Sequence, residues 1–435
     1  MGTFAKNSFW TVFSQGVIFA VGLCTSIIIA RILKPEGRGI YSLAIFLPAF
    51  LMYFSNIGIG LSATFYISSG KYPPKIVMGN SLICLLVHSV FAIVIGLIII
   101  QFFREYLFEG VSVKYLSLSL FIVPSQLYLS FILPILLGMQ RIREYNFFQV
   151  LRYILLFGMV IIFLTGLNAG VTGAIISEAL AAYITCIISF IIVSKETKGI
   201  SFKIDKGYLK NAYQYGGKLY AGFMLNFLSR RLNLILINFF MSPIMVGFFG
   251  LATTLSEKVW LVADAIGTVL FPKIASEKSK EEKNVFTSLV FKTTILIVVV
   301  ISIFLYIVGE WLIVFLYSPA FFESVRPFRL LLLGVVAGSG WKILENDLRG
   351  RGKPGLITCI MAVSFVVNIL LNIILIPRYG MLGAAWASVF STTFSLIISI
   401  FAFCQSSGNG VQSLLLFRQS DLVAYKNLVK SLVKS

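Results

Sequence analysis

The chain has 435 residues, of which 58% are hydrophobic and 12% are charged, and it carries a formal net charge of +19. Soluble domains are roughly 45–50% apolar and about 25% charged, so this composition excludes an ordinary soluble protein. Apolar stretches of roughly 20 residues, each long enough to cross a bilayer core of about 30 Å, recur along the whole sequence. The composition therefore predicts an all-α polytopic membrane protein.

The apolar stretches predict about twelve transmembrane helices. They lie near residues 8–30, 40–65, 79–102, 115–138, 147–167, 170–193, 213–240, 244–271, 286–309, 327–348, 354–376 and 380–404.

A polar, charged and glycine-containing segment separates these spans into two sets of six. We predict an N-terminal six-helix lobe over residues 1–193, a cytoplasmic inter-lobe linker over 194–212 and a C-terminal six-helix lobe over 213–404. Residues 405–435 form the predicted cytoplasmic C-terminal tail. Because six is even, both lobes enter the membrane in the same direction, as parallel repeats do around a central cavity.

The two predicted lobes share sequence at corresponding places. GVTGAIISEA at 170–179 matches GMLGAAWASV at 380–389 when the chain is shifted by about 210 residues. Nearly the same shift places KPEGRGIYSLA at 34–44 on SPIMVGFFGLA at 242–252. A period of half a chain indicates one duplicated unit, and in so apolar a chain it predicts a transporter with its path between the halves.

The positive charge lies mostly in segments predicted to be cytoplasmic. With the N-terminus inside, these segments hold about 22 Lys and Arg residues and the external loops hold about 8. This distribution follows the positive-inside rule and places both termini in the cytoplasm. It accounts for most of the net charge without an acidic partner, so we predict no nucleic acid among the partners.

The first lobe carries few charges within its spans. Arg31 ends the first span and Arg152 lies in the first two turns of the fifth. Both are candidates for substrate binding, and the alternative for each is an ordinary interfacial arginine. Gln15, in an uncharged polar stripe of the first span, is a further candidate. Glu178 is about eight residues into the sixth span, too deep to reach the surface easily, and is a candidate proton or cation site.

The seventh span carries a polar stripe inside the membrane. Asn226, Arg230 and Asn233 are spaced i, i+4 and i+7, so they share one face of a helix. A charge at the bilayer centre costs about 2.5–3.5 kcal/mol on insertion scales, and such residues usually face a cavity or a charged partner. We predict that the stripe lines the central cavity and binds substrate; the alternative for Arg230 is an interhelical salt bridge.

The eighth span carries Glu257, Lys258 and Asp264. Lys258 is a candidate for binding an anionic substrate, and the two carboxylates, which share a helix face at i and i+7, are candidate coupling-ion sites. The alternative is that Glu257 and Lys258 neutralise charges on neighbouring helices. The charged segment 342–347, at the cytoplasmic end of the tenth span, is interpreted as a solvated helix end.

Residues that bind metals or perform catalysis are scarce. His88 is the single histidine, and the five cysteines lie in apolar spans without CxxC spacing, so no metal site is predicted. No GxxxxGK[ST] loop is present to hold ATP phosphates. We therefore predict a transporter rather than an enzyme, with no cofactor. Its driving force is proton coupling, sodium coupling or the membrane potential alone.

Several segments resemble one known family. ARILKPEGRGIYSLAIFLPAF at 30–50 resembles the connection between the first two helices of bacterial polysaccharide flippases, whose pattern is roughly AR-x-LGPEG-x-G-x-Y, with Lys34 in place of the usual Gly. GMQRIREYNFFQVLR at 138–152 and IPRYGMLGAAWAS at 376–388 are similar to the same family. It is the oligosaccharide flippase branch of the multidrug/oligosaccharidyl-lipid/polysaccharide exporter superfamily. The resemblance implies two six-helix lobes around a V-shaped cavity that opens to each side in turn.

The resemblance also implies a function. Such a flippase carries undecaprenyl-pyrophosphate-linked oligosaccharide repeat units from the cytoplasmic to the external leaflet of the bacterial cytoplasmic (inner) membrane, for O-antigen or other surface polysaccharide biosynthesis. The arginines within the spans suit this substrate, because Arg holds phosphate bidentately and stays charged when desolvated. The implied partners are the lipid-linked oligosaccharide, the lipid bilayer, and the polymerase and chain-length regulator proteins of the same pathway.

Two alternatives remain open. A drug/cation antiporter of the same superfamily would exchange protons or sodium at Glu178, Glu257 and Asp264, but the arginines count against a cationic solute. A membrane glycan polymerase or ligase would need a large external loop to hold its catalytic residues, and the sequence provides none.

Overall fold

The computed structural model describes residues 2–408 and 410–415. All secondary-structure elements assigned within these residues are helices. This confirms the predicted fold class, an all-α polytopic membrane protein. Residues 416–435, which form most of the predicted C-terminal tail, lie outside the described residues.

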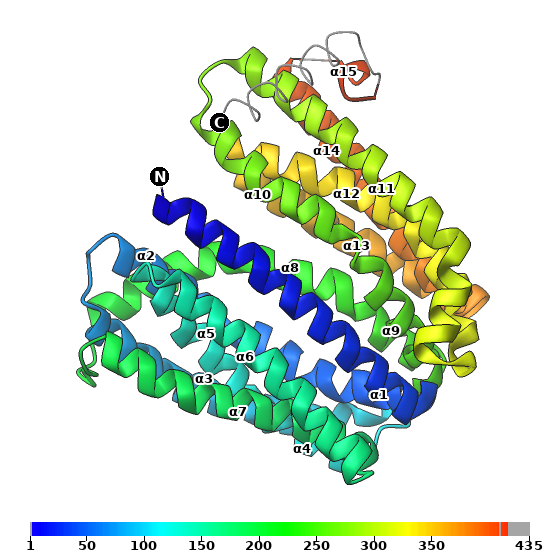
Figure 1. The fold of residues 1–435 in the computed structure, drawn as a ribbon, viewed down its shortest axis with the longest axis horizontal. Helices are drawn as coiled ribbons and strands as arrows, with labels where there is room; N and C mark the ends of the chain where they lie inside the picture. Colours follow the sequence, from blue (N-terminus) through cyan, green and yellow to red (C-terminus); the bar gives the residue numbers. More distant parts are fainter. Residues whose placement is uncertain (1, 409, 416–435) are drawn as a thin grey trace. The chain divides into compact units, whose positions relative to one another are not determined.

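Figure 1 follows the helices in chain order from blue to red. The first half of the chain forms α1 (Gly2–Asn56), α2 (Ile59–Ser68), α3 (Pro74–Leu107), α4 (Val113–Leu120), α5 (Ile122–Gly138), α6 (Ile142–Val160), η1 (Ile161–Gly166), α7 (Gly170–Glu196) and α8 (Lys206–Phe240). The second half forms α9 (Pro243–Glu257), α10 (Trp260–Ser276), α11 (Lys280–Tyr317), η2 (Pro319–Ser324), α12 (Val325–Gly350), α13 (Pro354–Tyr379), α14 (Met381–Ser407) and α15 (Gln412–Leu415).

The chain divides into two compact units. Unit 1 comprises Met1–Gly250 and Val314–Phe321, and unit 2 comprises Leu251–Ile313 and Phe322–Ser435. In unit 1, α1 packs against α3, α6 and α7, and α2 packs against α5 and α8. In unit 2, α12 packs against α10 and α14, and α13 packs against α14. Helices α9 and α11 each contribute residues to both units. The boundaries of the two predicted lobes stay a prediction.

Each predicted span is helical, and some spans, such as 115–138 and 244–271, are formed by two consecutive helices. Among the described residues, 8 helices are long and apolar enough to cross a membrane, or up to 9 if the bent pair α9 and α10 forms one span. One of the eight, Trp10–Asn56, has 47 residues and covers the first predicted span and most of the second. Helices α8 and α12 coincide with the seventh and tenth predicted spans but carry more charge.

Helix α1 is kinked between the first two predicted spans. Lys34 has φ 57° and ψ −179°, a backbone region that is essentially restricted to glycine. Pro35 follows it, and a proline ring disfavours the helical conformation in the residue before it. This conformation explains why the flippase pattern usually has glycine at this position. In this chain the position is occupied by Lys34.

The two matched segments of the internal repeat meet within unit 1. A Cβ added to Gly39 of α1 would overlap the carbonyl oxygen of Pro243, and a Cβ added to Gly247 of α9 would overlap the carbonyl oxygen of Pro35. Each segment places its glycine against the proline of the other, as two copies related by a two-fold axis do. Glycine permits this approach because it has no side chain to separate the backbones.

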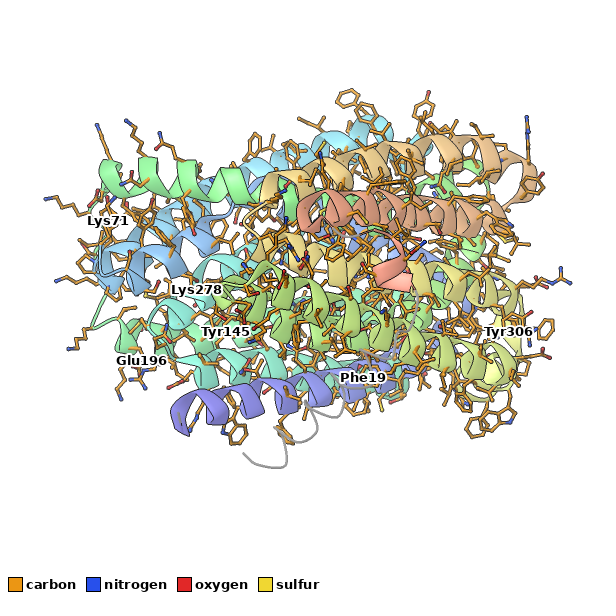
Figure 2. All side chains as sticks on the ribbon, turned by 90° about the horizontal axis from the view of Figure 1, so that it is seen from above. Phe19, Lys71, Tyr145, Glu196, Lys278 and Tyr306 are labelled. Carbon is orange, nitrogen blue, oxygen red and sulfur yellow. The ribbon has the colours of Figure 1, made fainter. Side chains whose placement is uncertain are left out.

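Apolar packing holds together the helices that carry the charges of unit 1. Ile29 and Leu33 of α1 pack with Val160, Leu164 and Ala174 at the α6–η1–α7 corner, and all five are buried. In a bilayer, such van der Waals packing holds helices together, because the lipid tails are as apolar as the side chains. Figure 2 shows Lys71 and Glu196 at the same end of unit 1, as expected for two predicted cytoplasmic segments.

Candidate functional site

Arg152 and Glu178, for which the sequence predicted different roles, are bound to each other. Arg152 Nη2 donates to Glu178 Oε1 at 2.5 Å across the α6–α7 contact. Because α6 begins at Ile142, Arg152 lies about 15 Å along its helix at 1.5 Å per residue, deeper than the predicted span implied. Glu178 lies about 12 Å from the start of α7. The pair therefore lies within two candidate membrane spans, Ile142–Gly166 and Gly170–Glu196, rather than at their ends.

Arg38 of α1 is a second arginine of unit 1 with low exposure. The Tyr41 hydroxyl is within electrostatic reach of both Glu178 and Arg152, and also of Arg38. The Arg38 side chain donates to the carbonyl oxygen of Ser26 at 3.0 Å and to Ser26 Oγ at 3.2 Å. Its Nε is buried without a hydrogen-bond partner, and the residue is 7% exposed.

These three charged residues of unit 1 comprise two arginines and one carboxylate. Within the described part of the chain, Arg38 has no carboxylate partner, and Glu178 is the carboxylate that pairs with Arg152. Arg38 was not among the predicted site residues, because it lies in the predicted connection between the first two spans, where arginines usually reach water. The sequence feature that could have indicated Arg38 is its spacing from Tyr41. Arg38 precedes Tyr41 by three residues, so the two share a face of α1.

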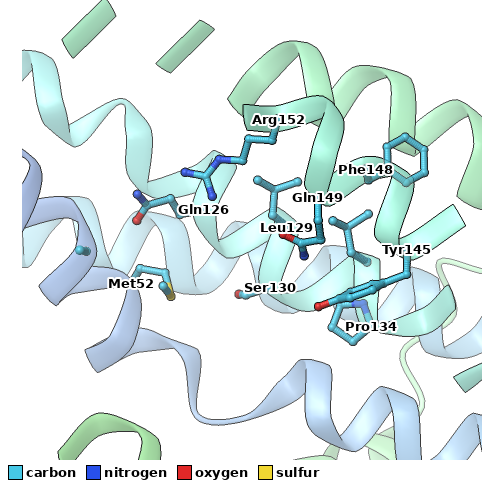
Figure 3. Close-up of a pocket in the computed structure, with 11 residues that line it drawn as sticks. Met52, Gln126, Leu129, Ser130, Pro134, Tyr145, Phe148, Gln149 and Arg152 are labelled. Atoms are coloured by element: carbon cyan, nitrogen blue, oxygen red, sulfur yellow. The ribbon is translucent and has the colours of Figure 1, made fainter. Parts of the chain in front are cut away.

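A cavity of about 270 Å³ lies within unit 1 between α1, α5 and α6. Figure 3 shows Arg152 and Gln126 toward one end of this cavity, and Tyr145 and Pro134 toward the other. The residues that line it are Ala49, Met52, Gln126, Leu129, Ser130, Leu133, Pro134, Tyr145, Phe148, Gln149 and Arg152. Arg152 thus has the cavity on one side and Glu178 of α7 on another.

Arg31 binds the end of α11. Its Nε donates to the carbonyl oxygen of Leu316 at 2.8 Å, and its Nη2 donates to the carbonyl oxygen of Phe315. Carbonyl groups in the last turn of a helix lack intrahelical partners, so Arg31 satisfies groups that would otherwise be unpaired. Arg38 reinforces this contact, since its guanidinium carbon lies 5.8 Å from the centre of the Tyr317 ring. The substrate-binding role of Arg31 stays a prediction.

The predicted stripe of the seventh span lies on one continuous helix, α8. Asn226 and Arg230 are half-buried and Asn233 is buried, whereas Gln15 on the first half of α1 is exposed. None of these four residues lines the cavity that contains Arg152. Their roles in substrate binding stay predictions.

In unit 2, the predicted coupling residue Asp264 is paired with a lysine. Lys342 Nζ donates to Asp264 Oδ1 and lies 5.4 Å from the centre of the Trp260 ring. The side chain of Lys342 is 12% exposed, and Asp347 is 0% exposed. The interpretation of segment 342–347 as a solvated helix end was therefore wrong, because these side chains pack between helices of unit 2.

Glu257 and Lys258 lie at a break in the eighth span. Helix α9 ends at Glu257, α10 begins at Trp260, and the two helices differ in direction by 41°. Broken helices in transporters free backbone groups inside the membrane and often border substrate or ion sites. The break agrees with a functional role for both residues, which stays a prediction, as does ion coupling at Glu178 and Asp264.

Comparison with known proteins identifies relatives along most of the chain. The family model of polysaccharide biosynthesis proteins matches residues 4–277. An uncharacterised membrane protein of Methanocaldococcus jannaschii is 24% identical over 88% of this chain and 98% of its own length. A putative O-antigen transporter of Shigella flexneri is 24% identical over 87% of this chain and 93% of its own length.

Solved structures share the fold. The lipid II flippase MurJ, in an inward closed conformation, matches with a TM-score of 0.74 at 15% identity, over 94% of this chain and 89% of its own. An inward-facing multidrug resistance MATE family transporter of the MOP superfamily matches with a TM-score of 0.73 at 14% identity, over 92% of this chain and 98% of its own. At these identities the comparison shows a shared transporter fold and no more.

Proposed function

Because the chain belongs to the family of polysaccharide biosynthesis proteins, we propose that it is a flippase for lipid-linked glycans. It moves undecaprenyl-pyrophosphate-linked oligosaccharide repeat units from the cytoplasmic to the external leaflet by alternating access. Two similar proteins, a putative O-antigen transporter and a lipid II flippase, support this proposal by their names. We place the protein in the bacterial cytoplasmic membrane with both termini in the cytoplasm, beside the polymerase and chain-length regulator of the pathway.

The observation that carries the proposal is the excess of positive charge in unit 1. Arg152 lines the cavity and is paired with Glu178, and Arg38 is buried without a carboxylate partner among the described residues. A buried charge without an opposite charge is strongly unfavourable, so this region is suited to receive an anion. Arg binds phosphate through two parallel N–H bonds and keeps its charge when water is excluded. A diphosphate that reaches the cavity therefore competes with Glu178 for Arg152.

In the proposed cycle, the pyrophosphate displaces Glu178 and binds Arg152, while the lipid tail stays in the bilayer. When the path opens to the external side, Glu178 pairs with Arg152 again and so helps to release the phosphate. Further substrate contacts are proposed for Arg31, Gln15, Asn226, Arg230, Asn233 and Lys258. Glu257 and Asp264 are proposed as additional coupling-ion sites.

A drug/cation antiporter is the second candidate, because the MATE transporter shares the fold to the same degree. The charges of unit 1 favour the glycan flippase. A cationic solute would have to approach Arg152 and Arg38 with a single carboxylate to offset them. A resistance assay in a host without drug pumps distinguishes the two, since the flippase is expected to confer no resistance.

Arg152→Gln is the direct test. In a host whose own flippase gene is deleted, we expect this variant to lower surface glycan about ten-fold or more, because a hydrogen-bonded charge pair to the phosphate is lost. Lipid-linked repeat units should accumulate in the cytoplasmic leaflet. The matched control is Arg104→Gln, which changes a partly exposed arginine in the last turn of α3 and should behave like the wild type.

Protein abundance is measured in parallel by immunoblotting of membranes. Wild-type surface glycan in Arg152→Gln cells, at wild-type abundance, would refute the assignment of Arg152. Accumulation of unpolymerised repeat units in the external leaflet of the deletion strain would refute flipping and indicate a polymerase or ligase.

A further inference from the structure

We propose that the cavity beside Arg152 binds a single sugar residue of the transported glycan, the residue adjacent to the pyrophosphate. The inference rests on the proposed function, because it assigns one part of the lipid-linked oligosaccharide to a defined place in unit 1. Gln126 is the residue that recognises the hydroxyl groups of this sugar. Arg152, at the same end of the cavity, holds the phosphate to which the sugar is linked.

The size of the cavity fits one ring. Its volume is about 270 Å³. Pockets that enclose drug-sized ligands have roughly 300–1,000 Å³, so this cavity lies just below that range. A single sugar ring, which is smaller than a drug-sized ligand, matches this volume.

An unpartnered acceptor inside the cavity points to a ligand that carries donors. Gln126 Oε1 is buried and has no hydrogen-bond partner. Another polar group nearby already has a partner, because Asn56 Nδ2 donates to Ser130 Oγ at 2.9 Å. Buried polar atoms are nearly always satisfied, so the Gln126 carbonyl is expected to accept a hydrogen bond from a sugar hydroxyl or N–H group.

The remaining lining suits the faces of a sugar ring. Met52, Leu133 and Pro134 present apolar surface, and Phe148 and Tyr145 add aromatic rings. Binding sites commonly combine a mostly apolar wall with a few placed polar groups, which fix the orientation of the ligand. A sugar has the matching character, because its ring carbons carry C–H groups on both faces and its hydroxyl groups project from the rim.

The charges and acceptors of the cavity exclude three other occupants. A metal cation would be repelled by Arg152. A phosphate group alone would satisfy Arg152 but would bring its acceptor oxygens against Gln126 Oε1, which is itself an acceptor. A lipid chain would fill the volume and leave both polar groups without partners, which is unfavourable. A sugar linked to a phosphate satisfies both groups at once.

The test uses the full-length protein in lipid nanodiscs and free sugars as probes. Glucose, galactose and N-acetylglucosamine are each added and observed by saturation-transfer NMR. We expect saturation of the ring protons of at least one sugar, and Gln126→Leu should reduce that transfer about ten-fold. The matched control is Gln101→Leu, which changes an exposed glutamine of α3 and should leave the transfer unchanged.

Thermal unfolding distinguishes a binding role from a structural role. Gln126→Leu replaces an unpartnered buried carbonyl by an apolar side chain of similar size, so the sugar-free variant should unfold at a higher temperature than the wild type. If the leucine variant does not fold, Met52→Phe provides a second test, because the larger ring occupies the cavity and should also abolish the transfer. The proposal is overturned if no sugar gives transfer that either variant reduces, or if Gln126→Leu lowers the unfolding temperature.

Inorganic pyrophosphate separates this proposal from the proposed function. Its binding, measured by isothermal titration calorimetry, should weaken in Arg152→Gln and persist in Gln126→Leu. If pyrophosphate bound equally well to the wild type and to Arg152→Gln, the phosphate site would be wrong even if sugars bind. Pyrophosphate binding that depends on Arg152, without any sugar transfer, would overturn the sugar site alone.

Discussion

Lys34 shows how a single residue in α1 can carry conformational strain. Its φ of 57° and ψ of −179° lie in a region that costs a residue with a side chain about 1–3 kcal/mol. Glycine avoids this strain, but it loses more conformational entropy on folding, which costs roughly 0.5–1 kcal/mol. We expect Lys34→Gly to stabilise the protein by about 1 kcal/mol, measured as a higher unfolding temperature in detergent.

Lys114→Gly is the control for this prediction. Lys114 lies in the regular helix α4, so glycine there should be destabilising by about 1 kcal/mol. Equal losses of stability in the two variants would show that Lys34 is not strained.

The Arg152–Glu178 pair predicts opposite changes in stability and in binding. Glu178→Gln leaves the Arg152 charge without its partner, which costs about 3–5 kcal/mol in a fully buried pair. Because the Arg152 side chain is 27% exposed, we expect a smaller loss of roughly 2–3 kcal/mol. The same variant lacks the carboxylate that competes for Arg152, so pyrophosphate should bind about ten-fold more tightly.

Thermal unfolding and calorimetric titration of the same samples check both parts of this prediction. Arg152→Gln serves as the comparison, since it should lose both stability and pyrophosphate binding. If Glu178→Gln also weakened pyrophosphate binding, Glu178 would not be a competitor for Arg152, and the exchange step of the proposed cycle would be wrong.

At the scale of elements, the contact between α1 and α9 depends on two glycines. A Cβ at Gly39 or Gly247 would overlap a backbone carbonyl oxygen of the opposite helix, and neither backbone can move aside as a flexible side chain would. We expect Gly39→Ala and Gly247→Ala each to be destabilising by about 1–3 kcal/mol, the usual range for overpacking. Unfolding temperatures in detergent measure the effect.

Gly158 of α6 provides the control for this contact. A Cβ there would meet nothing within 4 Å, so Gly158→Ala should stabilise the helix by roughly 0.5–1 kcal/mol. The prediction fails if Gly39→Ala and Gly158→Ala change the unfolding temperature in the same direction.

Two arginines related by the repeat shift fix the ends of α7 and α14, the sixth and twelfth predicted spans. Arg141 Nη2 donates to Glu196, at the end of α7, at 2.6 Å. Arg351 Nη2 donates to Asn284 Oδ1 at 2.8 Å, and Asn284 Nδ2 donates to the carbonyl oxygen of Ser407, at the end of α14, at 3.0 Å. The duplicated sequence therefore retains an equivalent tie, although its chemistry has changed from a direct ion pair to a chain of hydrogen bonds.

The two ties differ in burial, and so in their expected contribution to stability. Arg351 also donates to Asp347 at 2.7 Å, and the side chains are 8% and 0% exposed. Arg351→Gln leaves the Asp347 charge buried and unpaired, and we expect a loss of about 3–5 kcal/mol. Arg141 is 46% exposed, so Arg141→Gln should cost less than about 1 kcal/mol. Unfolding temperatures that rank the two variants in the reverse order would contradict this account.

For the whole molecule, the sequence was sufficient to predict the class of fold. A membrane span must satisfy all its backbone groups internally, so long apolar runs become helices whatever their neighbours are. The kink of α1 at Lys34 lies in the predicted connection between the spans 8–30 and 40–65. The pairing of charged residues could not be predicted in the same way. Whether Arg152 contacts Glu178 depends on how α6 and α7 are aligned along each other. Composition and periodicity do not contain that information. Arg38 was missed for another reason, because it lies in a predicted connection between spans.

The direction of transport follows from the charge of the proposed substrate. A pyrophosphate carries about two negative charges, and moving each charge across 100 mV is worth about 2.3 kcal/mol. Export from a side at negative potential is therefore favoured by roughly 4–5 kcal/mol per 100 mV. In proteoliposomes with a potassium diffusion potential, we expect a polyprenyl-pyrophosphate-linked sugar to be flipped faster toward the positive side, and the preference should reverse with the sign of the potential.

The alternative driving force is a proton gradient that acts through Glu178. Proton coupling would be the driving force if the flipping rate followed the pH gradient and did not change with the potential. In that case the rate should lose its pH dependence in Glu178→Gln.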